Sequence, residues 1–195
     1  MAKIKLTKNE LKSQRDALKR FQRYLPTLQL KKQQLQMEMR KLDLEIFNKR
    51  QEEQLERDQL ASWVRLYSEK IDLSEYVSIS RLKTSRGNIA GVNIPILDDL
   101  EFNEKTPDLF ETDPWMDEGV RVLKQLMRLR VERQVMEEQH RLLGEELRTT
   151  TQRVNLFEKV KIPEAKENIR VIRIFMGDQQ TAAVARSKIA KGKSA

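Results

Sequence analysis

The sequence contains no cysteine and a single histidine, His140, among its 195 residues. It therefore has no disulfide framework, no thiolate nucleophile and no cysteine-based zinc site. Aromatic residues make up 6% of the chain, and its apolar runs are far shorter than the roughly 20 residues of a membrane-spanning helix. The first residues also lack the apolar core of a signal peptide. We expect a cytoplasmic chain with no membrane insertion.

Charge is abundant and unevenly distributed along the chain. Charged residues make up 35% of the sequence, which favours narrow apolar seams with wide solvated faces over a thick core. Residues 1–70 carry 17 basic and 10 acidic groups, residues 71–114 carry 4 and 9, and residues 115–195 carry 17 and 11. Three of the five prolines lie in the acidic middle segment. The chain therefore divides into a basic arm, an acidic insert and a second basic arm.

The first arm has the pattern of a long coiled-coil helix. Thr7 and Glu10 have the spacing of a capping box, which predicts a helix start. Apolar residues then recur at alternating spacings of three and four, as in a heptad seam. The seam comprises Leu11, Leu18, Phe21, Leu25, Leu28, Leu35, Met39, Leu42, Ile46, Leu60, Trp63 and Tyr67. Pro26 interrupts this helix and should kink it locally.

The second arm has a similar seam. Asp113 and Pro114 suit the N-cap and first helical positions, and Asp117 and Glu118 suit the positive end of the helix dipole. The seam comprises Val122, Leu126, Leu129, Met136, Leu143, Leu147, Val154, Phe157, Ile162, Ala165, Ile169, Ile172 and Met176. Its phase slips by one residue at 161–163, where Pro163 should bend the helix, and Gly177 is the predicted stop.

Two seams of about equal length joined by one insert predict an antiparallel intramolecular pairing. This places residues 48–59 opposite residues 126–137, where both seams turn polar. We expect a polar waist that fixes the register, with Glu53 facing Arg133. The acidic side also offers Glu52, Glu56 and Asp58, and the basic side Arg128 and Arg130. His140 falls in the seam near Ile46 and is interpreted as a packing residue.

The insert has the pattern of a small β-hairpin. Residues 76–82 alternate with period two, residues 92–97 are rich in β-formers, and Arg86-Gly87-Asn88 has turn chemistry. Pro95 should lie on an edge, and residues 98–113 should form an acidic loop. We expect a knob at the end of the helical pair.

The predicted fold is mainly α, a long antiparallel two-helix coiled coil with a small β-hairpin insert between the helices. Its expected parts are residues 1–71, the N-terminal helix; 72–113, the insert; 114–177, the C-terminal helix; and 178–195, a basic tail.

No motif predicts catalysis, a cofactor or a metal. Gly192-Lys193-Ser194 resembles the end of a phosphate loop, but the required earlier glycine is Ser187 and no helix can follow. Nucleic-acid binding is disfavoured because Lys and Arg alternate with Glu over most of the chain. Strongly one-signed charge is confined to residues 1–23 and 159–195.

Three stretches resemble the D subunits of V/A-type rotary ATPases, the central rotor axle. They are residues 6–11 (Leu-Thr-Lys-Asn-Glu-Leu), residues 88–95 (Asn-Ile-Ala-Gly-Val-Asn-Ile-Pro), and residues 150–158 running on to Ile162-Pro163 and residues 169–173. They span nearly the whole chain in the family's order. The resemblance implies the same coiled coil with a hairpin insert, and a non-catalytic subunit.

The resemblance also implies partners. The basic tip would sit within the hexamer of catalytic and regulatory subunits A and B, facing it with Arg153, Lys161, Arg170 and Arg173. The insert end would bind the small F subunit of the rotor and seat in the C subunit, the socket of the membrane rotor. The insert residues implied are Ile79, Gly87, Asn88, Ile89, Gly91 and Pro95, and deletion of residues 76–97 should weaken partner binding. The alternative, on periodicity alone, is a free-standing coiled-coil adaptor or tether.

Overall fold

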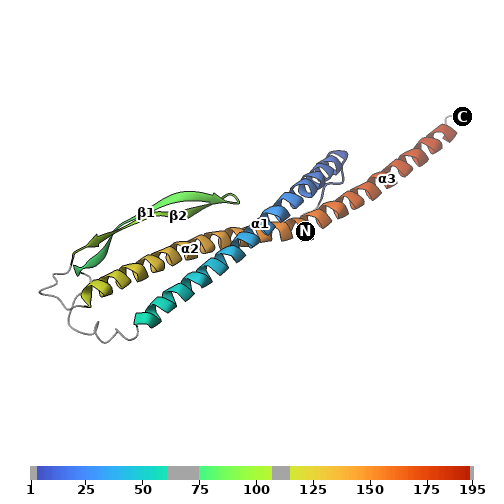
Figure 1. Ribbon diagram of the computed structural model, residues 1–195. Helices are drawn as coiled ribbons and strands as arrows, with labels where there is room; N and C mark the ends of the chain where they lie inside the picture. The colour runs from blue at the N-terminus through green and yellow to red at the C-terminus, as the bar shows by residue number, and fades with distance from the viewer. Residues whose placement is uncertain (1–3, 61–74, 107–114, 194–195) are drawn as a thin grey trace. The chain divides into compact units, whose positions relative to one another are not determined.

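The computed structural model describes residues 4–60, 75–106 and 115–193 (Figure 1). The predicted fold class is confirmed: long helices flank a two-stranded antiparallel sheet. The elements in order are α1 (Lys8–Leu60), β1 (Val77–Ile89), β2 (Val92–Glu104), α2 (Met116–Leu156), the π-helix η3 (Phe157–Lys161) and α3 (Ile162–Lys193). The predicted seam residues Trp63 and Tyr67 and the predicted helix start at Asp113-Pro114 lie outside the described residues.

The chain divides into two compact units. The first, here called the terminal unit, combines Met1–Gln33 with Arg148–Ala195, and the second, the hairpin unit, is Gln34–Leu147. Each unit thus pairs a part of α1 with a part of the C-terminal helices, as the antiparallel prediction requires.

Helix α1 begins where the sequence predicts, but only half of the capping box forms. The Glu10 backbone N–H donates to Thr7 Oγ1 at 3.3 Å, which satisfies one of the unpaired donors of the first turn. The Glu10 carboxylate does not close the box; it accepts a 2.8 Å hydrogen bond from Gln14 Nε2. The helix then passes through Pro26 without a break, and the local kink stays a prediction.

The one-residue slip in the second seam coincides with the π-helix η3. A π turn holds one more residue than an α turn, so it shifts the phase of the following helix by one position. The Ile162 backbone N–H donates to the Phe157 carbonyl, five residues back. Pro163 follows directly and would clash with a carbonyl four residues earlier in a regular α-helix. The wider turn therefore accommodates both the one-residue slip of the seam and the ring of Pro163.

The predicted helix stop at Gly177 is wrong, because α3 continues to Lys193. The residues after Gly177 include several alanines and two glutamines, which are strong helix formers. Thr181 Oγ1 donates to the Gly177 carbonyl at 3.1 Å, an ordinary contact within a continuing helix. A glycine costs about 1 kcal/mol in a helix interior, which the flanking residues offset here. Residues 178–193, predicted as a basic tail, are therefore helical.

Each unit has its own apolar core. In the terminal unit, Leu11, Ile169 and Ile172 form a buried cluster against Ile4, Leu18 and Met176, and the rings of Phe21 and Phe157 lie 5.1 Å apart. In the hairpin unit, Leu35, Leu42, Leu143 and Ile94 form the cluster, joining both helices to the hairpin. Among the remaining seam residues, Val154 is buried and Leu25, Leu28, Met39 and Leu147 are partly buried.

Candidate partner-binding site

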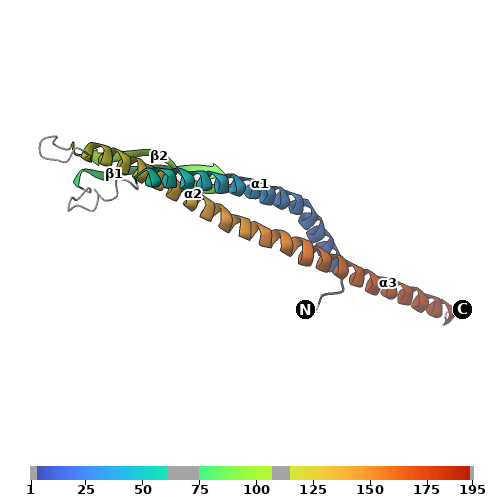
Figure 2. The same cartoon turned by 60° about the horizontal axis from the view of Figure 1, so that its bottom comes forward.

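The hairpin folds back along the helices and is not a knob at their end (Figures 1 and 2). The residues around its turn, Ile89, Ala90 and Val92, pack on the cluster of Leu35, Leu42 and Leu143. Further along β2, Gln139 Nε2 donates to the Pro95 carbonyl at 2.6 Å, and Lys124 bonds Glu104. Ile94 of β2 is 4% exposed because the helices cover it. Burial of this apolar side chain favours the position of the hairpin along the helices.

The turn lies later in the sequence than predicted. Arg86-Gly87-Asn88 belongs to β1, and the turn residues are Ala90 and Gly91, with φ of 51° and 82°. Two successive positive φ angles are the signature of the tight hairpin turn whose twist matches the strands. Asn88 Oδ1 accepts from the Gly91 backbone N–H at 3.0 Å, and Asn88 Nδ2 donates to Asn93 Oδ1 at 3.1 Å. Asn88 and Gly91 therefore help to hold a turn centred on Ala90 and Gly91.

The strands are also longer than predicted, since residues 98–104 belong to β2 and not to a loop. Two register shifts, between Ile79 and Arg81 and between Lys83 and Thr84, interrupt the period-two alternation that marks a strand in sequence. Gly87 leaves room for the Ile96 side chain, which would have to shift if a Cβ were added at position 87. Ile79 (43% exposed) and Leu82 (49% exposed) leave an apolar surface uncovered on β1.

The predicted polar waist is present in the hairpin unit, and its central pair is the expected one. Arg133 Nε lies 3.0 Å from Glu53 Oε2, which confirms the predicted register at this point. Both residues occupy core slots of their heptads, so Glu53 is 7% exposed. Arg57 also bonds Glu53, at 2.6 Å. A buried carboxylate that bonds two guanidinium groups penalises any register that would leave it unpaired.

The other waist contacts differ from the predicted ones. Glu56 accepts from Gln125 Nε2 at 2.7 Å, and Lys49 lies 3.1 Å from Glu132. Arg128 pairs with Glu132 on its own helix and Arg130 is exposed, so neither of the two expected arginines bridges the helices at the waist. Sequence analysis missed Lys49, although a lysine in a core slot of the heptad was a usable signal.

A second missed contact flanks the seam. Arg50 Nη2 donates to Glu137 Oε1 at 2.9 Å, and Arg133 Nη1 donates to the same oxygen at 2.8 Å. The hydrogen bond from Arg50, followed by that from Arg133, lowers the pKa of Glu137, with desolvation opposing it. Arg50 and Glu137 stand next to core slots on their helices, where charged pairs commonly set the alignment of coiled coils.

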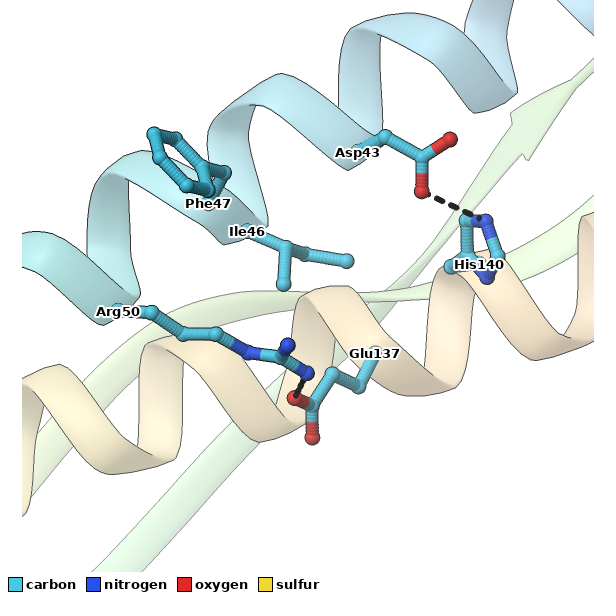
Figure 3. Close-up of a pocket in the computed structure, with 6 residues that line it drawn as sticks. All are labelled: Asp43, Ile46, Phe47, Arg50, Glu137 and His140. Atoms are coloured by element: carbon cyan, nitrogen blue, oxygen red, sulfur yellow. Dashed lines mark hydrogen bonds and ion pairs between the residues drawn. The ribbon is translucent and has the colours of Figure 1, made fainter.

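His140 lies at the edge of a shallow hollow of about 320 Å³ between α1 and α2 (Figure 3). Its Nε2 lies 3.0 Å from Asp43 Oδ1, and the buried Ile46 lines the same hollow. One imidazole beside one carboxylate can orient and hydrogen-bond, but nothing here supplies a nucleophile or an oxyanion site. The predicted packing role near Ile46 agrees with this position.

The four cations predicted to face a hexamer lie in the terminal unit. Lys161 bonds Glu164 at 3.2 Å and Arg170 bonds Glu167 at 2.6 Å, each along its own helix. The pKa of Glu167 is lowered chiefly by its hydrogen bond from Arg170. Arg153 and Arg173 are exposed. These contacts run along single helices, so they leave the guanidinium and ammonium groups at the surface.

Among the described residues, no cluster of three or more His, Cys, Asp or Glu side chains could hold a metal ion. None of the helices in this part of the chain combines the length and apolarity needed to cross a bilayer. The described surface thus offers polar contacts, a hairpin with exposed apolar residues and a cationic helix pair. These features define a class of protein: a mainly helical chain of paired antiparallel helices with a β-hairpin insert.

Comparison with known proteins identifies the family. The family model for the D subunit of ATP synthase matches residues 10–192. A V-type ATP synthase D subunit of Borreliella burgdorferi is 50% identical over 191 residues, covering 98% of this chain and 95% of the relative. The D subunit of the V-type ATP synthase of Chlamydia abortus is 33% identical over 195 residues, covering 98% and 94%. The chain therefore belongs to the ATP synthase D-subunit family.

Proposed function

We propose that this chain is the central-stalk rotor subunit of a V/A-type ATPase. It transmits torque between the catalytic A/B hexamer and the membrane rotor ring and has no catalytic site of its own. In this role it couples ATP synthesis or hydrolysis to ion translocation, and it is peripheral to the membrane through the complex. Its partners are subunits A, B, F and C.

The observation that carries the proposal is the register-fixed pairing of the helices. A shaft must resist sliding of one helix past the other when it is twisted. The hairpin unit provides such resistance through the pair of buried Glu53 with half-buried Arg133 and through the flanking Arg50–Glu137 pair. Both lie between positions far apart in sequence, so slippage by one residue would break them together.

The charge distribution supports the proposed orientation. Residues of the terminal unit include 21 basic and 6 acidic groups, a net charge of +15. A cationic, mostly exposed helix pair suits a bearing that turns within a protein sleeve, because exposed charges form weak and exchangeable contacts. Arg153, Lys161, Arg170 and Arg173 are the proposed contact residues.

The hairpin is the proposed contact for the small F subunit. Its exposed Ile79 and Leu82 leave apolar area for a partner, while Asn88, Gly91 and Gly87 hold the turn and the strand that present it. A deletion that respects the hairpin removes Val77–Glu104. Such a deletion should leave the helices folded by circular dichroism and weaken binding of the F subunit.

The first test is purification of the intact complex in mild detergent with subunit stoichiometry. A rotor axle should be present at one copy per three catalytic pairs. A free-standing adaptor or tether, the alternative function, would have no fixed ratio to a nucleotide-hydrolysing partner.

A second test addresses torque directly. An Arg173→Cys variant in the otherwise cysteine-free chain can be oxidised to a cysteine introduced in the surrounding hexamer. Crosslinking should stop ATP hydrolysis, and a reducing agent should restore it. Hydrolysis that continues with a fully crosslinked shaft would rule out rotation of this chain.

A further inference from the structure

Within the hairpin unit, α1 has two opposite apolar faces. The inner face carries Leu35, Leu42 and Ile46, which are 0%, 5% and 8% exposed. The outer face carries Met37, Leu44 and Phe47, which are 64%, 65% and 57% exposed. Figure 3 shows Ile46 pointing from α1 toward α2 and the Phe47 ring projecting from another side of α1. Phe47 also lines the hollow between the two helices, so it stands at the border of the outer face.

The outer residues have the spacing of a helix-docking seam. Met37, Leu44 and Gln51 lie seven residues apart, and so do Arg40, Phe47 and Gln54. Together they alternate by three and four residues, the pattern that packs a helix against another helix. In the inner heptad these are the positions farthest from the core, where polar residues are expected. From Met37 to Phe47 the outer seam covers about 15 Å at 1.5 Å per residue.

Single exposed apolar side chains are ordinary on a protein surface. Three large ones on one line, at the positions of a heptad that should be polar, indicate an interaction surface. Gln51 and Gln54 then end the apolar part of the seam on its C-terminal side. From Met37 to Phe47 the apolar part of the surface spans about three helical turns.

The charge on this seam restricts what can cover it. Arg40 stands between Met37 and Leu44, and Lys41 is exposed beside it. Arg40 forms no ion pair within the described part of the chain. Its only acidic neighbour three or four residues away is Asp43, whose carboxylate already lies 3.0 Å from His140 Nε2. An occupant that buries Arg40 must therefore bring its own carboxylate.

A second copy of this chain does not meet that requirement. The seam positions from Met37 to Gln54 contain no acidic residue, so two copies packed seam to seam would leave Arg40 unpaired. An arginine and a carboxylate form a strong, directional pair when they meet at an interface.

We propose that the outer seam of α1, formed by Met37, Arg40, Leu44 and Phe47, docks an amphipathic helix of a partner protein that places a carboxylate against Arg40. This surface is distinct from the hairpin contact proposed above. That the partner belongs to the same ATPase rests on the proposed function.

The test is site-specific photo-crosslinking in the purified complex. A benzophenone amino acid replaces Leu44, and the matched control replaces Tyr24, which lies on the same helix, is 57% exposed and stands outside the seam. The Leu44 probe should crosslink to one partner peptide, mapped by mass spectrometry to a helix with apolar heptad spacing and an Asp or Glu. The Tyr24 probe should not yield that peptide. No crosslink at Leu44, a crosslink to a second copy, or one to a segment without a carboxylate would overturn the proposal.

A charge exchange provides the second measurement. Arg40→Glu should lower retention of the crosslinked partner about tenfold, Arg40→Lys should keep most of it, and an acidic-to-Arg change at the mapped partner position should rescue Arg40→Glu. Unchanged retention in Arg40→Glu, or failure of the rescue, would overturn the role of the charge. Far-UV circular dichroism of each variant checks that the helices remain folded.

The stoichiometry separates this proposal from the proposed function. A chain that co-purifies with the catalytic subunits but gives no Leu44 crosslink refutes only the docking seam. A mapped acidic helix from a protein outside any ATPase, with no catalytic subunits present, supports the seam and refutes the rotor function.

Discussion

The terminal unit and the hairpin unit each contain part of α1 and part of α2 but carry opposite net charge. The terminal unit has 21 basic and 6 acidic residues, whereas the hairpin unit has 17 basic and 24 acidic. In the hairpin unit, ion pairs such as Glu53–Arg133 and Arg50–Glu137 cross between the helices. In the terminal unit, the helices meet through the Leu11–Ile169–Ile172 cluster, the Phe21–Phe157 contact and an amide pair, Asn168 to Gln14 at 3.4 Å.

This difference shows two ways of fixing one alignment. Ion pairs need both signs of charge, and the hairpin unit has them in near balance. The strongly cationic terminal unit has few carboxylates that could form ion pairs between its helices. The alignment of these helices therefore depends on apolar packing and on neutral hydrogen bonds. The predictions below test this contrast, from the largest expected effect to the smallest.

Leu143→Ala should have the largest effect on stability. Leu143 is fully buried at the meeting point of α1, α2 and the hairpin, and we expect a loss of about 3 kcal/mol in the free energy of unfolding. Urea unfolding followed by far-UV circular dichroism measures this loss.

Leu11→Ala, in the two-helix core of the terminal unit, should lower the free energy of unfolding by less. Val184→Ala, at a 55% exposed site, should change stability by under about 0.5 kcal/mol. A larger loss for Leu11→Ala would contradict the greater packing of the hairpin unit.

Arg133→Ala should destabilise the hairpin unit by about 2 kcal/mol, because it leaves the buried Glu53 carboxylate with Arg57 alone. Replacing both Glu53 and Arg133 by Leu should recover most of the loss while weakening the register. A Glu53→Cys, Arg133→Cys pair should crosslink within one chain. Efficient crosslinking of Glu53→Cys to a cysteine introduced one helical turn before or after position 133 would contradict the assigned alignment.

The turn gives an effect of about 1 kcal/mol in each direction. Ala90 adopts φ of 51°, where an L-residue with a Cβ is strained, so Ala90→Gly should stabilise the hairpin. Gly91→Ala, at φ of 82°, should destabilise it. Amide hydrogen exchange of β1 and β2 measures both changes. Helices of the terminal unit serve as the internal control, since their protection should stay constant.

Salt should affect the two units in opposite directions. Raising the ionic strength from about 0.05 to 0.5 M shortens the screening length well below 10 Å. Repulsion within the cationic terminal unit should weaken, and its amides should become several-fold better protected. The exposed ion pairs of the hairpin unit should weaken slightly. Equal changes in both units would show that net charge does not distinguish them.

The smallest expected effect is on acid stability. Because the pKa of Glu137 is lowered in the folded chain, its contribution is present above its unfolded value of about 4.3 and is lost as the pH falls through the lower folded value. Glu137→Gln should therefore lower the melting temperature slightly at pH 6, and this difference should shrink as the pH falls below the unfolded value. Glu167→Gln, at an exposed pair on one helix, should show an even smaller difference.

Much of the fold was predictable because heptad spacing is a strong signal. The predicted seam residues from Leu11 to Ile172 are buried or partly buried where they are described. The register inferred from the equal lengths of the two seams correctly placed Glu53 opposite Arg133. The slip at residues 161–163 was also visible, although the sequence alone did not identify a π-helix.

The remaining features were not predictable because they depend on tertiary contacts or on local conformation. The extent of β2 was hidden by the bulge at Asp98, which breaks the alternation of this strand. The turn was misplaced because Gly87 is present to make room for Ile96 and not to turn the chain. The fold-back of the hairpin depends on Ile94 finding the helix cluster, a contact far from local sequence. The contacts of Arg153, Lys161, Arg170 and Arg173 with a hexamer stay a prediction.

The π turn at Phe157–Lys161 makes the winding of one short segment decisive for everything after it. Each residue of an α-helix advances the chain by about 100°, and the π turn accommodates one residue more than an α turn. Deleting one residue within this segment should therefore allow a regular α-helix in which Ile169 and Ile172 still face Leu11. The same deletion between Ile162 and Ile169 has no such extra residue to remove, so it would turn Ile169 and Ile172 by about 100° away from Leu11.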